Sequence, residues 1–138
     1  MQNYPFVCPI QVRWRDLDAF AHVNNAVFAS YLEVARTEFW RQRFGGRSTM
    51  EIPFFVRRLE IDFKRPISLD GEVQVWLRVG EIRGASFDFE YLVEADGSTA
   101  AVAVTTLACV DTTSGRPVRI AEDVRALLAT LQVREKPG

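Results

Sequence analysis

The stretch "RDLDAFAHVNNAVFASYLEVAR", residues 15–36, determines how the rest of the chain must be arranged. Its first half holds two carboxylates, the only histidine of the chain and two asparagines. From Asn25 onward apolar side chains recur every three or four residues, which is the spacing of an amphipathic helix. The sequence therefore predicts a helix over residues 25–44, stopped by the glycine pair 45–46 because glycine accepts a left-handed helix end.

Apolar residues cover most of the circumference of this predicted helix, so only a narrow polar face remains. A helix of this kind is enclosed by other elements rather than lying on a surface. The apolar stripe consists of Phe28, Leu32, Ala35 and Phe39, widened by Ala26, Tyr31, Val34 and Trp40, and the polar face consists of Ser30, Glu33, Thr37 and Arg41.

The remaining sequence alternates apolar and polar residues, as half-buried strands do. A first strand is expected over residues 6–14. Four more follow the helix: one around "LEIDF" (59–63), one over 73–79, one over 87–93 and one over 99–111. "EADGST" (94–99) predicts a hairpin turn, and residues 121–131 predict a short amphipathic helix.

The order strand, long helix, four strands, short helix predicts an α+β fold in a single domain over residues 1–138. Four consecutive strands with short turns favour an antiparallel meander, which the first strand joins at an edge or by insertion. One apolar face of the sheet needs a cover, and only the first helix is long enough to provide it. We therefore expect a curved antiparallel five-stranded sheet wrapped around one central helix, with a short C-terminal helix.

Composition and charge narrow the function. Seventeen basic and eighteen acidic residues give a net charge of −1, which argues against a nucleic-acid-binding protein. No apolar run is long enough to span a membrane, and "MQNYPFVCPI" (1–10) lacks the features of a signal peptide, so a cytoplasmic protein is expected. Cys8 and Cys109 have no metal-ligand spacing, so we expect two small buried hydrophobes and no metal site.

The polar cluster at the helix entrance contains the groups that acyl transfer requires. Asn24 or Asn25 is well placed to cap the helix, and the other amides of the first turn point outward with partial positive charge. Such amides polarise a carbonyl and stabilise an oxyanion. Asp18, a few residues earlier, is able to attack that carbonyl or to activate a water.

Ordinary turn chemistry explains the same residues. An Asp-x-Asp pair before a helix often serves only as turn and cap. Asp16 lies nearer the strand end, where it is expected to bind neighbouring backbone amides. His22 is a candidate base, or a hydrogen-bonded scaffold residue. The spacing alone leaves both interpretations open.

Three segments together resemble the hotdog-fold acyl-CoA thioesterases of the 4-hydroxybenzoyl-CoA thioesterase-like family. They are "VRWRDLDAFAHVNNAVFASYLEVAR" (12–36), "FFVRRLEIDFKRPISLDGEVQV" (54–75) and "EIRGASFDFEYLV" (81–93). The first is the most specific, with its Asp-x-Asp loop, its His-Val-Asn-Asn turn and a Glu-x-x-Arg on the helix. The three segments span nearly the whole chain in the order that the family shows.

The resemblance implies a role for each polar residue at the entrance. Asp18 matches the catalytic carboxylate, and the amide that polarises the thioester falls around Asn25. Asp16 and His22 match positions with supporting roles. Ala21 stands where the family usually has glycine, and a positive φ at that turn would strain alanine by roughly 1 kcal/mol.

The resemblance also implies a binding site for coenzyme A and an oligomer. Basic residues and amides near a turn between the middle strands meet the coenzyme A phosphates in this family. Its active sites lie at dimer interfaces, so a homodimer or homotetramer is expected. The candidates are Arg83, Gly84 and Ser86, with Lys64 and Arg65 as neighbours; Arg57 and Arg58 are equally available, and any of these is otherwise an ordinary surface residue.

The expected reaction is hydrolysis of an acyl-CoA to a carboxylic acid and coenzyme A, with no metal or redox cofactor, since coenzyme A is part of the substrate. One alternative is an acyl group carried on acyl carrier protein, and another is a non-catalytic module that binds acyl-CoA. No nucleic acid and no membrane insertion are expected. Phe28, Tyr31 and Leu32 line the acyl pocket or simply fill the core.

Overall fold

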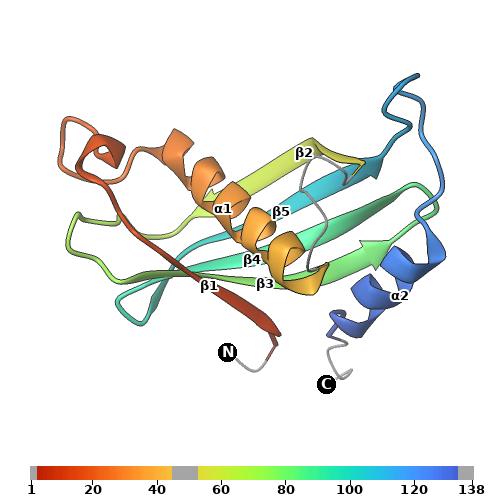
Figure 1. The fold of residues 1–138 in the computed structure, drawn as a ribbon. Helices are drawn as coiled ribbons and strands as arrows, with labels where there is room; N and C mark the ends of the chain where they lie inside the picture. Colours follow the sequence, from red (N-terminus) through yellow and green to blue (C-terminus); the bar gives the residue numbers. More distant parts are fainter. Residues whose placement is uncertain (1–2, 45–52, 134–138) are drawn as a thin grey trace.

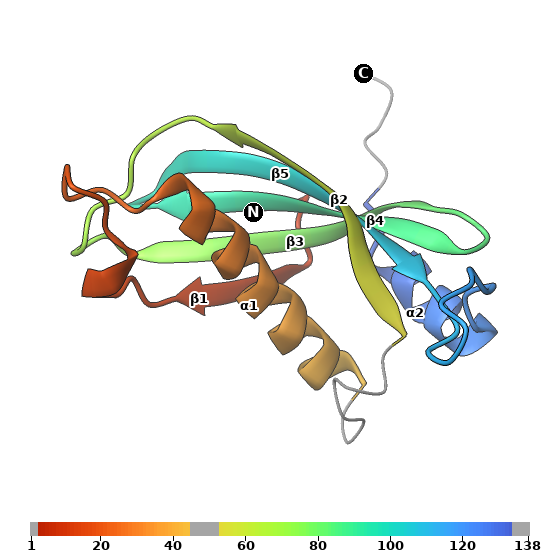
Figure 2. The ribbon, with the colours of Figure 1, turned by 90° about the horizontal axis from the view of Figure 1, so that it is seen from above.

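A computed structural model describes residues 3–44 and 53–133, and it confirms the predicted fold class. One antiparallel sheet of five strands curves around the long helix α1, and the short helix α2 lies at one end of the sheet (Figures 1 and 2). The elements are β1 (Phe6–Ile10), a 3₁₀ turn (Trp14–Asp16), α1 (Asn25–Arg43), β2 (Phe54–Phe63), β3 (Val73–Ile82), β4 (Ser86–Ala95), β5 (Ser98–Cys109) and α2 (Glu122–Thr130).

Helix α1 begins and ends where the apolar periodicity predicts. Asn24 is its N-cap, with the side-chain oxygen accepting a hydrogen bond of 2.9 Å from the amide of Ala26. The predicted glycine stop at 45–46 lies outside the described residues. The side chains buried against the sheet are Phe28, Tyr31, Leu32, Ala35, Phe39 and Trp40. Val34, which the prediction placed in the apolar stripe, is 49% exposed, so within one chain α1 is covered on one side only.

The predicted four-strand meander is wrong for β2. The strand order is β1-β3-β4-β5-β2, so only β3, β4 and β5 form a meander, and β2 pairs with β5. The reason is the connection after β2, which spans residues 64–72 and is too long for a tight hairpin. The amides of Lys64 and Arg65 both donate to the carbonyl of Ala100, at 2.7 and 3.1 Å, before the chain crosses to β3.

Strand β2 extends the sheet so that it also covers the side of α1 that carries Phe28 and Trp40. Phe28, near the start of the helix, contacts Phe63 with ring centroids 5.1 Å apart. Trp40, near its end, stacks on Phe54 at 5.5 Å. Helix and strand therefore run side by side in opposite directions along the inner face of the sheet.

The first strand is shorter than predicted. It covers Phe6–Ile10 rather than residues 6–14, and it lies at the edge of the sheet beside β3. The chain leaves the sheet because Trp14–Asp16 form a 3₁₀ turn, in which the Asp16 side chain accepts a hydrogen bond of 2.9 Å from the amide of Arg13.

The core lies between α1 and the inner face of the sheet, where aromatic rings meet edge to face. Phe39 and Phe89 are 5.1 Å apart, and Phe87 and Phe89 are 4.8 Å apart. Both cysteines are buried, which confirms that prediction. Neither of the described helices has the length and hydropathy that crossing a bilayer requires.

Candidate active site

Residues 16–24 form a narrow loop that leads directly into α1. The amide of Asp18 donates to the carbonyl of His22 at 2.7 Å, and the amide of Asn24 donates to the carbonyl of Asp16 at 2.8 Å. The amide of Val23 donates at 2.8 Å to a carbonyl of the segment that follows β2. The loop is thus fixed both to the helix start and to the end of the sheet where β2 finishes.

The Asp18 carboxylate lies on the surface of this loop. Its Oδ1 accepts the amides of Phe20 at 2.8 Å and His22 at 3.2 Å. No described residue donates a hydrogen bond to its Oδ2, and no described lysine or arginine forms an ion pair with it. One oxygen therefore shapes the turn, as the structural interpretation requires, while the other stays open to solvent.

The first turn of α1 leaves one amide unused. The side chain and the carbonyl of Asn24 accept the amides of Ala26 and Val27, each at 2.9 Å. The amide of Asn25 makes no hydrogen bond with the described residues. This N–H lies at the positive end of the helix, so it is available to a carbonyl oxygen or an oxyanion.

Asp16 is structural, as predicted. Its carboxylate is 1% exposed and accepts the Arg13 amide at 2.9 Å, the Arg13 guanidinium at 2.9 and 3.1 Å, and the Tyr31 hydroxyl at 2.8 Å. Burial alone would raise the pKa of Asp16, but the hydrogen bonds from Arg13 and Tyr31 outweigh it and lower the pKa. Burial and Asp16 together raise the pKa of Tyr31.

His22 contributes to the loop through its backbone. Its amide and carbonyl both bond to Asp18, whereas its exposed imidazole makes no hydrogen bond with the described residues. A positioning role for His22 remains a prediction.

The residues predicted to meet coenzyme A fall into two groups: Arg83, Gly84 and Ser86 in the β3–β4 hairpin, and Lys64 and Arg65 after β2. Within one chain the two groups are not neighbours, which corrects the prediction. Ser86 pairs with Ala108, whereas Lys64 and Arg65 bond to Ala100. Those positions are eight residues apart along β5, or about 26 Å.

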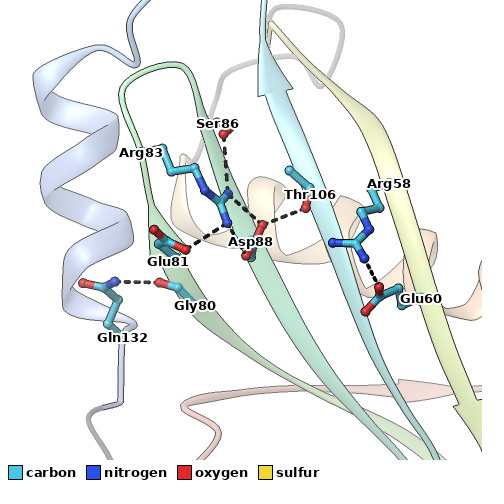
Figure 3. A network of polar contacts seen from close by, with 9 residues as sticks. All are labelled: Arg58, Glu60, Gly80, Glu81, Arg83, Ser86, Asp88, Thr106 and Gln132. Carbon is cyan, nitrogen blue, oxygen red and sulfur yellow. Dashed lines mark hydrogen bonds and ion pairs between the residues drawn. The ribbon is translucent and has the colours of Figure 1, made fainter.

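Arg83 is already engaged by carboxylates (Figure 3). It donates to both oxygens of Asp88, at 3.0 and 2.9 Å, and to Glu81 at 3.0 Å. Thr106 donates to the same Asp88 at 2.8 Å. A phosphate at this hairpin would compete with two acidic side chains, so the structure weakens the case for Arg83 within a single chain.

A cleft of ≈270 Å³ opens between α1 and β2, and Asp18 does not line it. Phe28 and Leu32 do not line it either, and their burial supports core packing over an acyl-pocket role. Arg36 does line the cleft, and sequence analysis assigned it no function. Two signals were available. Arg36 is the arginine of the Glu-x-x-Arg in the segment 12–36, and it lies four residues after Leu32 and four before Trp40, on a stripe of the helix that is otherwise apolar.

Comparison with known proteins identifies the family of this chain. A model of the thioesterase-like superfamily matches residues 12–128. The acyl-CoA thioesterase YbgC of Haemophilus influenzae is 30% identical over 91% of this chain and 96% of its own length. The long-chain acyl-CoA thioesterase FadM of Escherichia coli is 27% identical over 86% of this chain and 93% of its own.

Solved structures agree as well. The thioesterase of Thermus thermophilus, crystallised with coenzyme A and zinc, is 38% identical and superimposes with a TM-score of 0.88 over 99% of this chain and all of the other. This chain belongs to the thioesterase-like superfamily and has its hotdog fold. Among the described residues, no three His, Cys, Asp or Glu side chains are grouped to hold a metal ion.

Ala21 adopts φ 62°, the left-handed conformation that the usual glycine would take without strain. We expect Ala21→Gly to raise the free energy of unfolding by about 1 kcal/mol, measured by urea denaturation. Ala19→Gly is the matched control, because Ala19 lies in the same loop without a positive φ. Equal effects of the two substitutions would contradict the strain at Ala21.

Removing the Tyr31 hydroxyl tests the anchor of the loop. Tyr31→Phe should lower the free energy of unfolding by about 2 kcal/mol at neutral pH, because a buried carboxylate loses a hydrogen bond. The pKa of Asp16 is lowered in the folded state, so its contribution exists above the ordinary value near 4 and is lost as the pH falls through the lowered pKa. Denaturation curves from pH 7 to pH 3 should therefore converge for the two proteins, and a constant gap would argue against this role of Asp16.

Proposed function

We propose that this chain is an acyl-CoA thioesterase, with Asp18 as nucleophile or general base and the amide of Asn25 as oxyanion donor. The observation that carries the proposal is the Asp18 carboxylate itself. One oxygen is fixed by two loop amides, and the other accepts no hydrogen bond from the described residues. The loop enters a helix whose first amide donates to none of them. The named activities of the relatives support the same reaction.

In the nucleophilic route, Oδ2 of Asp18 forms a bond to the thioester carbon, and the carbonyl oxygen becomes an oxyanion that accepts a hydrogen bond from Asn25. Collapse breaks the carbon–sulfur bond, and the coenzyme A thiolate takes a proton from water. Water then hydrolyses the mixed anhydride, which releases the acid and restores Asp18. In the general-base route Asp18 removes a proton from a water that attacks the same carbon. Collapse of the oxyanion then breaks the carbon–sulfur bond, and Asp18 returns the proton to the leaving coenzyme A thiolate. Both routes use the fixed orientation that the loop amides give to the carboxylate.

The site is completed, in this proposal, by a second copy of the chain paired along β2. This strand hydrogen-bonds to β5 on one side only, so its other edge is unpaired among the described strands. Val56, Leu59 and Phe63 on β2 are 39%, 44% and 44% exposed. An unpaired edge with exposed apolar side chains favours strand pairing with another chain.

Antiparallel pairing of two β2 strands would also reunite the two groups of coenzyme A candidates. In each chain the 83–86 hairpin lies at the end where β2 begins, and the Asp18 loop lies at the end where β2 finishes. A two-fold axis across β2 brings the hairpin of one copy to the Asp18 end of the other. Residues that are about 26 Å apart within a chain would thus serve one site from two chains.

Asp18→Asn tests the chemistry directly. Asparagine keeps an oxygen for the amides of Phe20 and His22, so the loop retains its shape while the charge is lost. Across a panel of acyl-CoAs of graded length we expect turnover to fall at least about a hundredfold, with binding of coenzyme A retained. Asp70→Asn removes an exposed carboxylate after β2 and should change little.

Undiminished turnover by Asp18→Asn would eliminate Asp18 from the mechanism. If the wild-type protein hydrolyses only thioesters of acyl carrier protein, the carrier of the acyl group is that protein and not coenzyme A. A wild-type protein that binds acyl-CoA and hydrolyses no thioester would be a binding module instead.

The proposed interface is tested by a charge on β2. Leu59→Lys should convert a dimer or tetramer into smaller species in analytical ultracentrifugation and should lower activity, because two lysines would face each other across the axis. Val7→Lys is the control, since Val7 is 38% exposed on β1, the opposite edge of the sheet. If Val7→Lys dissociates the oligomer and Leu59→Lys does not, the interface lies along β1, which would contradict the proposed pairing along β2.

A further inference from the structure

Arg36 is held in an unusual setting in the middle of α1. It is half-buried, and its Nη1 donates to the Tyr91 hydroxyl at 3.3 Å. Tyr91 in turn shares a hydrogen bond of 2.6 Å with Thr105, and both of these residues are buried in the core. The guanidinium is therefore fixed from its core side by a chain of neutral hydroxyl groups.

No carboxylate of residues 3–44 and 53–133 forms an ion pair with Arg36. A guanidinium stays charged at every physiological pH, and a charge removed from water without a partner is costly. Carboxylates pair with six of the other described arginines, namely Arg13, Arg41, Arg58, Arg78, Arg83 and Arg119.

The cleft between α1 and β2 that Arg36 enters has an apolar side and a polar side. Trp40, Phe54, Val56 and Leu107 form the apolar lining, and Glu33 and Thr37 complete it. An apolar strip along β2 leads toward this cleft from the helix start. It runs from Phe63, which contacts the first turns of α1 through Phe28, past Leu59 to Val56.

We propose that this cleft receives the far end of the substrate's acyl group, and that the preferred acyl groups end in a carboxylate bound by Arg36. The inference rests on the proposed thioesterase function. The planar guanidinium fork matches a carboxylate, and a methyl terminus would leave Arg36 desolvated and unpaired. Arg36 is thus a specificity-determining residue, and the apolar strip holds the methylene chain.

The distances fit a substrate of medium length. Arg36 is eleven residues from Asn25, about 16 Å along the helix axis, and its side chain leans back toward the helix start. Because that side chain brings the guanidinium closer to Asn25 than its Cα is, an extended acyl group of about ten carbons is on the scale of the remaining separation. Glu33 also lines the cleft, but it is exposed, so water screens its charge more than that of Arg36.

The test compares kcat/KM for matched thioesters that differ only at the far end: adipyl-CoA against hexanoyl-CoA, and sebacyl-CoA against decanoyl-CoA. Wild type should prefer the carboxylate-terminated member of at least one pair by about tenfold or more. Arg36→Gln should abolish that preference while retaining hydrolysis of the methyl-terminated thioester. Arg36→Lys should keep part of it, because the charge remains without the fork.

Two controls separate charge in the cleft from charge on the helix. Arg41→Gln removes an exposed arginine of α1 that pairs with Glu38, and it should leave the preference unchanged. Glu33→Gln removes the opposing charge of the cleft and should strengthen the preference.

Hydrolysis without any preference for a carboxylate terminus in wild type would overturn the proposal, and this measurement needs no variant. A preference that persists in a folded Arg36→Gln protein would overturn it equally. The absence of hydrolysis for every thioester would instead count against the proposed function, so the two failures are distinguishable.

Discussion

The candidate site depends on one buried carboxylate. Asp16 accepts hydrogen bonds from Arg13 on one side and from Tyr31 of α1 on the other. It thereby ends the first strand, orients the loop that follows and ties that loop to the helix. The other contacts of the loop are backbone hydrogen bonds, the two amides that Asp18 accepts and the buried side chain of Val23. Asp16 adds the side-chain hydrogen bond that links the loop to α1. Asp16 thereby positions Asp18, which lies two residues later. In the proposed function Asp16 provides support and Asp18 carries out the chemistry.

The second constraint is the need to bury the apolar side of α1. Three strands of a meander cover part of that side, and β2 must leave its neighbour in sequence to cover the rest. The outcome is an edge strand with exposed apolar residues and an open cleft beside the helix. The proposed function also depends on this edge. A second copy of the chain that pairs there would cover the strand and would bring together the two groups of coenzyme A candidates, which lie apart within one chain.

Much of the fold was predictable because it follows from local periodicity. The limits of α1, the alternation of β3, β4 and β5 and the hairpin at 95–98 are all encoded by neighbouring residues. The strand order was not predictable from the sequence, because "LEIDF" pairs equally well with any strand of suitable direction. The connection of nine residues after β2 permits several partner strands. At the site, Asp18 and Asn25 stood out through residue types that capping alone did not require, and the family resemblance sharpened that choice. Arg36 was missed because an arginine in a helix is usually solvated.

The sequence by itself determined that a buried helix begins at Asn25 behind an acidic loop, and that strands must enclose it, since periodicity and composition act over a few residues. Tertiary structure alone decided which oxygens of Asp16 and Asp18 are engaged, and that β2 lies at an edge of the described sheet. It also decided that Arg36 reaches Tyr91 without an ion pair to a carboxylate of residues 3–44 and 53–133. These features join residues up to 55 positions apart. They arise from packing of whole elements against one another, which no local pattern records.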